Sequence, residues 1–336
     1  MRMIVAVLRM PLRPVWHSAA ASLRVAAITV ALTVAAESAA EDGARWLERA
    51  AQAAKTLNYT GTVVYQHNGH VETSRLVHMV EGGREQEKLV SLDGPPREVI
   101  RSSDEVRCYF PDAKVVRVEA RTFRNVFPSL SAEQLRNLSQ YYEAKMVVSE
   151  RVAGQWTQVM VFTPTDGLRY GHKFWADAKT GLLLKARLVD DRGEAVEQFA
   201  FTDVSINEKV DLDMVRPSWP KAPPDWQMRQ GSFGEVAPKD TGWAVGKVPP
   251  GFQKVIEGDR VWRGGRGPAK QLVYSDGLVS ISVFIEPLAL PSAPIGATQQ
   301  GGLSYFTTKS DDYVVTVLGE APPAAVRQIA QSVARH

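Results

Sequence analysis

The chain has 336 residues, of which 40 are Lys or Arg and 37 are Asp or Glu, and its formal net charge is +3. A nucleic-acid-binding face requires a strong basic excess, and this near-neutral chain gives no such signal. The one cysteine, Cys108, excludes an intramolecular disulfide, and its alternation with Val106 and Phe110 favours a small buried residue over a reactive thiol.

The first 40 residues have the pattern of a secretory signal peptide. Arg13 and Arg24 precede an apolar run at 25–36, and small residues follow at 38–40. The run is too short to cross a bilayer comfortably, which disfavours an uncleaved anchor. We predict cleavage after Ala40, with Met10 as an alternative start. The segment holds four of the basic residues and one acid, so the remaining chain is formally neutral.

A helix and then a series of strands are predicted after the signal. Asp42 suits a helix cap, and Trp46, Ala50 and Leu57 recur on one helical face. The period then changes to two in Thr60–His67 and Val71–Val80, which flank Asn68-Gly69, a strong hairpin signal. Further strands are predicted at Lys88–Leu92, Arg97–Ser102, Val106–Phe110 and Lys114–Glu119.

A second helix is predicted to interrupt the strands. Ser131 and Gln134 form a capping box, and Leu135, Leu138 and Tyr142 follow at helical spacing. Strands resume at Lys145–Val152, Trp156–Thr163, Tyr170–Ala176, Leu182–Asp190 and Ala195–Ile206. About ten sequential strands joined by short turns indicate an antiparallel meander.

A proline-rich segment marks the predicted domain boundary. Pro217, Pro220, Pro223 and Pro224 lie within eight residues, and such a stretch is extended and cannot continue a ladder. We therefore predict a first domain at 41–215, a linker at 216–239 and a smaller domain at 240–336. In the smaller domain, hairpins are predicted at Gln271–Glu286 around Asp276-Gly277 and at Leu303–Leu318, and a last helix starts near Pro322 or Pro323.

Residues with catalytic or metal-binding patterns are sparse. His67 and His70 flank one turn and make half a zinc site at most, so an exposed cross-strand pair is favoured. The chain has no Gly-x-Ser-x-Gly elbow, His-Glu-x-x-His helix or phosphate-cradling glycine-rich loop. We predict no catalytic, cofactor-binding or metal-binding residues, and a protein that is not an enzyme.

Several segments together resemble a known family along nearly the whole chain after the signal. Their order and spacing carry the resemblance, since no single segment is diagnostic. The segments are Trp46-Leu47, Tyr59–Tyr65, Leu89–Gly94, Pro217-Ser218-Trp219, Pro249–Phe252, Tyr274–Leu278 and Val317–Pro323. The chain resembles the MucB/RseB family, periplasmic regulators of the sigma-E envelope-stress response.

This resemblance implies a mainly β (α+β) fold. Its large domain is expected to be a half-open antiparallel β-barrel similar to LolA and LolB with covering helices, followed by a smaller β-rich domain with a C-terminal helix. It also implies binding to the periplasmic part of a membrane-spanning anti-sigma factor, which protects that factor from proteolysis. Release is expected when the regulator senses lipid, lipopolysaccharide or mislocalised lipoprotein, and family members tend to self-associate.

Two residue sets follow as hypotheses. The predicted lining of a lipid cavity is Trp156, Met160, Phe162, Phe174, Leu184 and Phe201. The predicted contacts to the anti-sigma factor, on an aromatic anchor or a sheet edge of the second domain, are Trp262, Arg263, Tyr274 and Phe284. Alternation alone does not distinguish a cavity from a dry core, and Trp262 and Phe284 also suit a core. The alternative function is a periplasmic carrier of lipid or lipoprotein.

Overall fold

The computed structural model describes residues 43, 45–102, 105–120, 138–219, 223–230, 233–262, 268–288 and 294–336. The predicted signal peptide at 1–40 and the predicted helix start at 131–137 lie outside these residues. Within the described ranges, no helix combines the length and the apolar character needed to cross a membrane.

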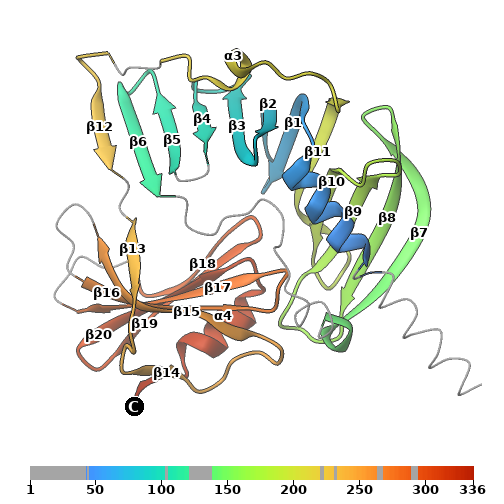
Figure 1. The fold of residues 1–336 in the computed structure, drawn as a ribbon. Coiled ribbons are helices and arrows are strands. Elements are labelled where there is room, and N and C mark those ends of the chain that lie inside the picture. Colours follow the sequence, from blue (N-terminus) through green and yellow to red (C-terminus); the bar gives the residue numbers. More distant parts are fainter. Residues whose placement is uncertain are drawn as a thin grey trace, which may run out of the picture. The chain divides into compact units, whose positions relative to one another are not determined.

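A twelve-stranded sheet forms the first part of the fold (Figure 1). Its order is β12-β6-β5-β4-β3-β2-β1-β11-β10-β9-β8-β7. The strands are β1 (Tyr59–His67), β2 (His70–Glu81), β3 (Arg84–Ser91), β4 (Glu98–Arg101), β5 (Glu105–Phe110), β6 (Val115–Ala120), β7 (Tyr142–Val152), β8 (Gln155–Pro164), β9 (Gly171–Asp177), β10 (Leu183–Val189), β11 (Ala195–Ile206) and β12 (Gln227–Gln230). All neighbours are antiparallel except β12 and β6. Since β7 and β12 lie at the two ends of the order and do not pair with each other, the predicted half-open antiparallel sheet is confirmed.

The first hairpin follows from its turn residues. Asn68 and Gly69 both have positive φ, 46° and 75°, as a type I′ turn requires. The turn sets His67 opposite His70 and, further along, Tyr59 opposite His78. The two predicted strands are therefore paired without a register shift from the turn to the far end of the hairpin.

A helix over residues 45–56 covers one face of this sheet, and Figure 1 shows it in blue near β9 and β10. Its Trp46 ring stacks on Phe174 with centroids 6.1 Å apart. Leu47 and Ala50 share a buried cluster with Met160 and Phe162 from the sheet. The sheet's apolar residues and the helix's apolar stripe therefore cover each other.

The predicted linker is held against the other part of the first sheet. After α3 (Leu212–Val215), Ser218 donates from its N–H and its hydroxyl to the buried Glu98 carboxylate, at 2.8 and 2.5 Å. The Lys88 ammonium donates to the Arg216 carbonyl at 2.8 Å. Trp219 then lies beside Tyr109, with ring centroids 6.0 Å apart.

The same segment contributes a strand to each sheet, which the sequence analysis did not predict. β12 pairs in parallel with β6, and β13 (Phe233–Pro238) pairs with β15 of the second sheet. The four residues of β12 are mostly polar, so they carry no apolar alternation that would indicate a strand.

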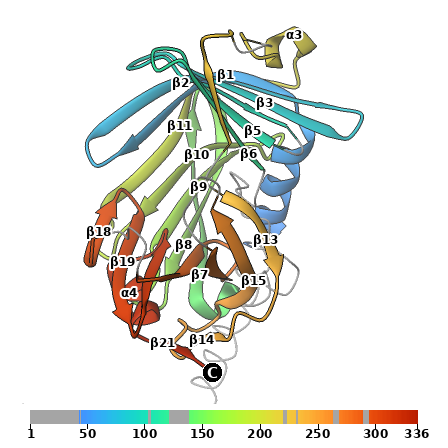
Figure 2. The ribbon, with the colours of Figure 1, turned by 90° about the vertical axis from the view of Figure 1, so that its left-hand side faces the viewer.

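The second sheet has seven strands in the order β13-β15-β16-β17-β20-β19-β18. They include β15 (Gln253–Trp262), β16 (Pro268–Ser275), β17 (Ser280–Pro287), β18 (Gly296–Gln300), β19 (Leu303–Ser310) and β20 (Tyr313–Gly319). The C-terminal helix α4 (Pro323–Ala330) packs on β19 and β20 (Figure 2). β14 (Trp243–Val245) and β21 (Val333–Arg335) form a small third sheet. Both predicted hairpins and the predicted last helix are present.

Candidate functional site

Five of the six residues predicted to line a cavity are buried in packed clusters. Met160, Phe162 and Phe174 lie in the cluster that includes Trp46 of helix 45–56. Leu184 and Phe201 lie in a second cluster, and the Phe201 ring meets Tyr59 edge-on. The side chains face the interior, and in this structure their neighbours are other core residues.

Trp156 does not face the interior, which corrects the prediction for this residue. Its side chain is 62% exposed, and the Arg151 guanidinium lies 6.0 Å from its ring centroid. The alternation does place Trp156 on the face of Met160. It comes one residue after the start of β8, however, next to the turn at Ala153-Gly154, where burial is lost.

Two of the predicted partner contacts in the second domain, Tyr274 and Phe284, are core residues. Tyr274 and Phe284 are each only 7% exposed, so neither is a surface anchor in this structure. Tyr274 packs in the main apolar cluster of the second sheet, and the Arg260 guanidinium lies 5.8 Å from the Phe284 ring. Trp262 ends β15, its side chain is outside the description, and Arg263 lies outside the described residues.

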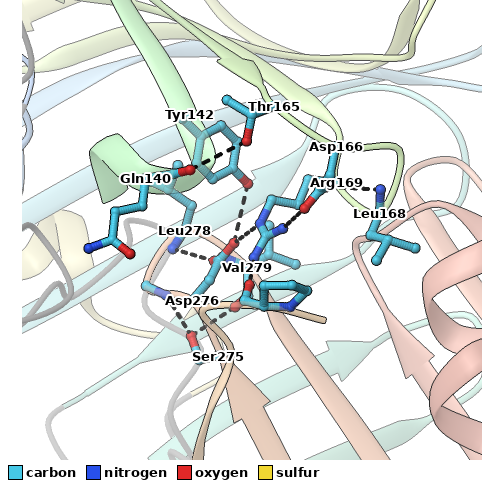
Figure 3. Close-up of polar contacts among 12 residues, drawn as sticks. Gln140, Tyr142, Thr165, Asp166, Leu168, Arg169, Ser275, Asp276, Leu278 and Val279 are labelled. Carbon is cyan, nitrogen blue, oxygen red and sulfur yellow. Dashed lines mark hydrogen bonds and ion pairs between the residues drawn. The ribbon is translucent and has the colours of Figure 1, made fainter. Parts of the chain in front are cut away.

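A buried polar cluster joins the two sheets (Figure 3). We call it the Arg169 network; it comprises Tyr142, Asp166, Arg169, Asp276 and the carbonyl of Pro250. Arg169 Nε donates to Asp276 Oδ2 at 3.0 Å, and the Tyr142 hydroxyl donates to the same oxygen at 3.3 Å. Arg169 also donates to Asp166 and to the Pro250 carbonyl. Its side chain is 0% exposed and that of Asp276 is 2% exposed.

Local turns hold both carboxylates of the network in place. Asp276 Oδ1 accepts the backbone N–H groups of Leu278 and Val279, at 3.0 and 2.9 Å, in the hairpin between β16 and β17. Asp166 Oδ1 accepts the N–H of Leu168 at 2.9 Å, in the loop between β8 and β9. Asp276-Gly277 was predicted only as a turn; the burial of its carboxylate has no signal in the sequence.

Burial dominates the electrostatics of the network. It raises the pKa of Asp276, while the backbone N–H of Val279 and the Arg169 charge act in the opposite direction. Burial and the nearby Asp276 charge hold the pKa of Tyr142 well above its usual range, so the phenol remains a donor. The guanidinium also lies 4.7 Å from the Tyr141 ring and 5.0 Å from the Phe252 ring. The arrangement can bind the two sheets together, because separation would break the Arg169–Asp276 ion pair and the hydrogen bonds to the Pro250 carbonyl and the Tyr142 hydroxyl.

A second contact between the sheets comes from β18 and from the turn that joins it to β19. Gln299 Nε2 donates to the Tyr170 hydroxyl at 3.0 Å, and the Gly302 N–H donates to Glu197 Oε2 at 3.3 Å. A Cβ atom on Gly302 would lie 2.4 Å from Leu188 Cδ2, so glycine permits this close approach.

His172 lies within the first sheet close to the Arg169 network. Its ring stacks on Phe174 at 5.5 Å and tilts against Tyr142 at 5.9 Å. In the described part of the chain its Nε2 has no hydrogen-bond partner. Burial lowers the pKa of His172 from 6.5 to about 4, so the imidazole is neutral in the folded protein at neutral pH.

The remaining candidate residues form no site. His67 and His70 face each other with ring centroids 5.8 Å apart, and Cys108 is half-buried. Across the described ranges, no group of three His, Cys, Asp or Glu residues is placed to hold a metal ion.

Comparison with known proteins gives matches along nearly all of the chain. The MucB/RseB N-terminal domain matches residues 42–219, and the MucB/RseB C-terminal domain matches residues 237–334. The sigma factor AlgU regulatory protein MucB of Pseudomonas aeruginosa is 32% identical over 310 residues, which are 88% of this chain and 91% of MucB. The sigma-E factor regulatory protein RseB of Escherichia coli K12 is 27% identical over 282 residues, or 84% and 87% of the two chains.

Two solved MucB structures match this chain with a similar identity and coverage. The crystal structure of MucB in complex with MucA(peri) has a TM-score of 0.66 and 29% identity, and covers 88% of this chain and 99% of that chain. The crystal structure of MucB has a TM-score of 0.61 and 28% identity, and covers 88% and 98%.

Proposed function

Since the chain belongs to the MucB/RseB family, we propose that it works in the periplasm, where it binds the periplasmic region of a membrane anti-sigma factor. The observation that carries this proposal is the match along 88% of the chain to a MucB solved in complex with MucA(peri). Binding shields the partner from proteolysis, and sensing of lipid, lipopolysaccharide or mislocalised lipoprotein releases it. The protein holds its partner and catalyses no reaction.

Release requires two states that lipid and partner favour differently. The Arg169 network supports a docked state, because its buried ion pair is satisfied only when the two sheets are together. An acyl chain would compete with helix 45–56 for the face of Met160, Phe162 and Phe174. A coupling of about 1–3 kcal/mol changes partner affinity by about 5- to 150-fold.

The free edge of the second sheet is the proposed contact for the partner. β18 ends the strand order, and residues 297–300 are exposed. An extended segment of the anti-sigma factor would add a strand there through backbone hydrogen bonds. This keeps the predicted sheet-edge alternative on the second domain but moves the contact from the strands of the buried Tyr274 and Phe284 to β18.

The test is a pull-down of the periplasmic anti-sigma segment by the exported chain, with and without lipid. We expect retention without lipid, slow cleavage of the retained segment by an added protease, and release when acyl-bearing lipid is added. Ala297→Pro removes an edge N–H and should weaken retention, whereas Ala297→Val should not. If both variants retain the segment as well as the unchanged protein does, the β18 edge is excluded as the contact. If the unchanged protein retains no segment, the proposed regulator function is excluded.

A carrier of lipid or lipoprotein is the alternative. Deletion of the gene separates the two functions: loss of a regulator raises stress transcription directly, whereas loss of a carrier first misplaces lipoproteins.

A further inference from the structure

Three basic side chains converge on one tryptophan ring, on the sheet face opposite helix 45–56. Lys173 and Trp175 alternate in β9 with Phe174, which stacks on Trp46 of the helix, so they point away from it. Lys185 and Arg187 of β10 are their direct cross-strand neighbours. The Lys173 and Lys185 ammonium groups lie 4.6 and 4.5 Å from the Trp175 ring centroid, and the Arg187 guanidinium carbon lies at 5.7 Å.

Two of these cations are held in fixed positions. Glu150 accepts from Lys173 Nζ at 3.0 Å and from Trp175 Nε1 at 2.8 Å. Arg187 donates from Nε and Nη2 to Gln198 Oε1, at 2.9 and 2.6 Å, which leaves Nη1 for a ligand. Lys173 likewise retains two of its three ammonium donors.

Lys185 forms no hydrogen bond or ion pair with any described residue. Its ammonium group instead makes a cation–π contact with the Trp175 ring. Partial burial and the charges of Arg187 and Lys173 lower its pKa, while Glu150 acts in the opposite direction. Three cations against one carboxylate leave this cluster with an unbalanced positive charge.

We propose that Lys173, Lys185 and Arg187 form a binding site for a phosphate group, either free or in a lipid headgroup. A phosphate carries up to two negative charges and three or more acceptor oxygens, which suits donors that converge from three side chains. The flat Trp175 ring closes the floor of the site, and its neighbours on β9 and β10 leave the cations half-buried rather than fully solvated.

The test measures inorganic phosphate binding to the full chain by titration calorimetry. Lys185→Gln should weaken binding by roughly ten- to hundredfold, because it removes a charge-assisted hydrogen bond. Lys185→Arg should retain binding. Lys209→Gln, at a lysine whose side chain is 89% exposed, removes the same charge elsewhere and should leave the affinity unchanged. Lys185 has no hydrogen-bond partner in the described chain, so its substitution should leave the thermal unfolding temperature unchanged.

A second arm separates the two sources of phosphate. Vesicles of phosphatidylglycerol in phosphatidylcholine should bind the chain less well after Lys185→Gln, and inorganic phosphate should compete, if a headgroup is the ligand. Phosphate binding without vesicle binding identifies free phosphate. Absence of both, or equal losses in Lys185→Gln and Lys209→Gln, overturns the site. The anti-sigma pull-down on the same variants is a separate readout, so failure of the site is distinct from failure of the proposed regulation.

Discussion

Arg169 is a cation with no access to solvent, and its position is set by residues from both sheets and their loops. Two carboxylates, a carbonyl and three aromatic rings surround it. A charge in such a place is tolerated only with its partners, so each member of the network constrains the others. The neighbouring His172 differs: its ring is buried, its Nε2 has no hydrogen-bond partner among the residues that the structure describes, and the imidazole stays neutral at neutral pH.

Removal of Arg169 should be far more costly than removal of a surface arginine. Arg169→Met leaves Asp276 buried and unpaired, and should lower the free energy of unfolding by about 3–5 kcal/mol. The double variant Arg169→Met/Asp276→Leu should lose less than the sum of the two single variants. Arg216→Met, at an arginine with 63% exposure, should lose less than about 1 kcal/mol. Denaturant unfolding measures all four; a loss below 1 kcal/mol in Arg169→Met would contradict the assigned role.

The lowered pKa of His172 predicts that the folded protein loses stability in mild acid. Its pKa of about 4 in the folded protein lies below the usual imidazole value of 6.5, so between these pH values the unfolded chain binds a proton that the folded chain does not. The contribution of His172 to the free energy of unfolding is therefore fully present above pH 6.5, and it falls by about 3 kcal/mol as the pH approaches 4. His172→Phe should flatten the dependence of unfolding free energy on pH across this window, whereas equal slopes in both proteins would refute it.

At the scale of elements, the turns and alternation were predictable and the covering contacts were not. Asn68-Gly69 and Asp276-Gly277 predict their hairpins because short turns need particular residues. Trp156 was misplaced because alternation gives the face of a strand but not the length over which a helix covers it. The polar β12 and the buried Asp276 depend on partners more than 100 residues away, so local pattern carries no information about them.

Gly302, in the β18–β19 turn, is a position where an added side chain should disturb the docking of the second sheet on the first. Gly302→Ala places a methyl group against Leu188 and Glu197 and should cost about 1–3 kcal/mol through overpacking. Gly167→Ala is the matched control, because its Cβ would meet no atom within 4 Å. Hydrogen exchange of β10 and β11 should accelerate in the first variant alone. Unchanged exchange would show that the turn contributes nothing to docking.

At the scale of the whole molecule, the free edge at β7 makes self-association a proposal with a defined surface. β7 ends the first sheet, and Met146 and Val148 are 50% and 85% exposed on it. An unpaired edge strand that exposes apolar side chains can pair with a second copy. Val148→Lys should lower the average mass in sedimentation velocity without changing the unfolding temperature, whereas Val255→Lys, at another exposed valine, should not. Equal masses for all three proteins would remove β7 as the interface.

The passage from β12 to β13 has a mechanical consequence. Only two residues separate these strands in the sequence, so the ends of β12 and β13 stay within about 11 Å of each other whatever else moves. The loop bearing Arg169 lies beyond β9, nine strand steps along the sheet from that tether. Loss of the Arg169–Asp276 ion pair therefore cannot separate the two sheets completely. If the second contact through Gln299 and Gly302 opens as well, the second sheet can rotate about this short connection, and the separation is then largest at the far end of the first sheet, beside the packed residues that an acyl chain would displace.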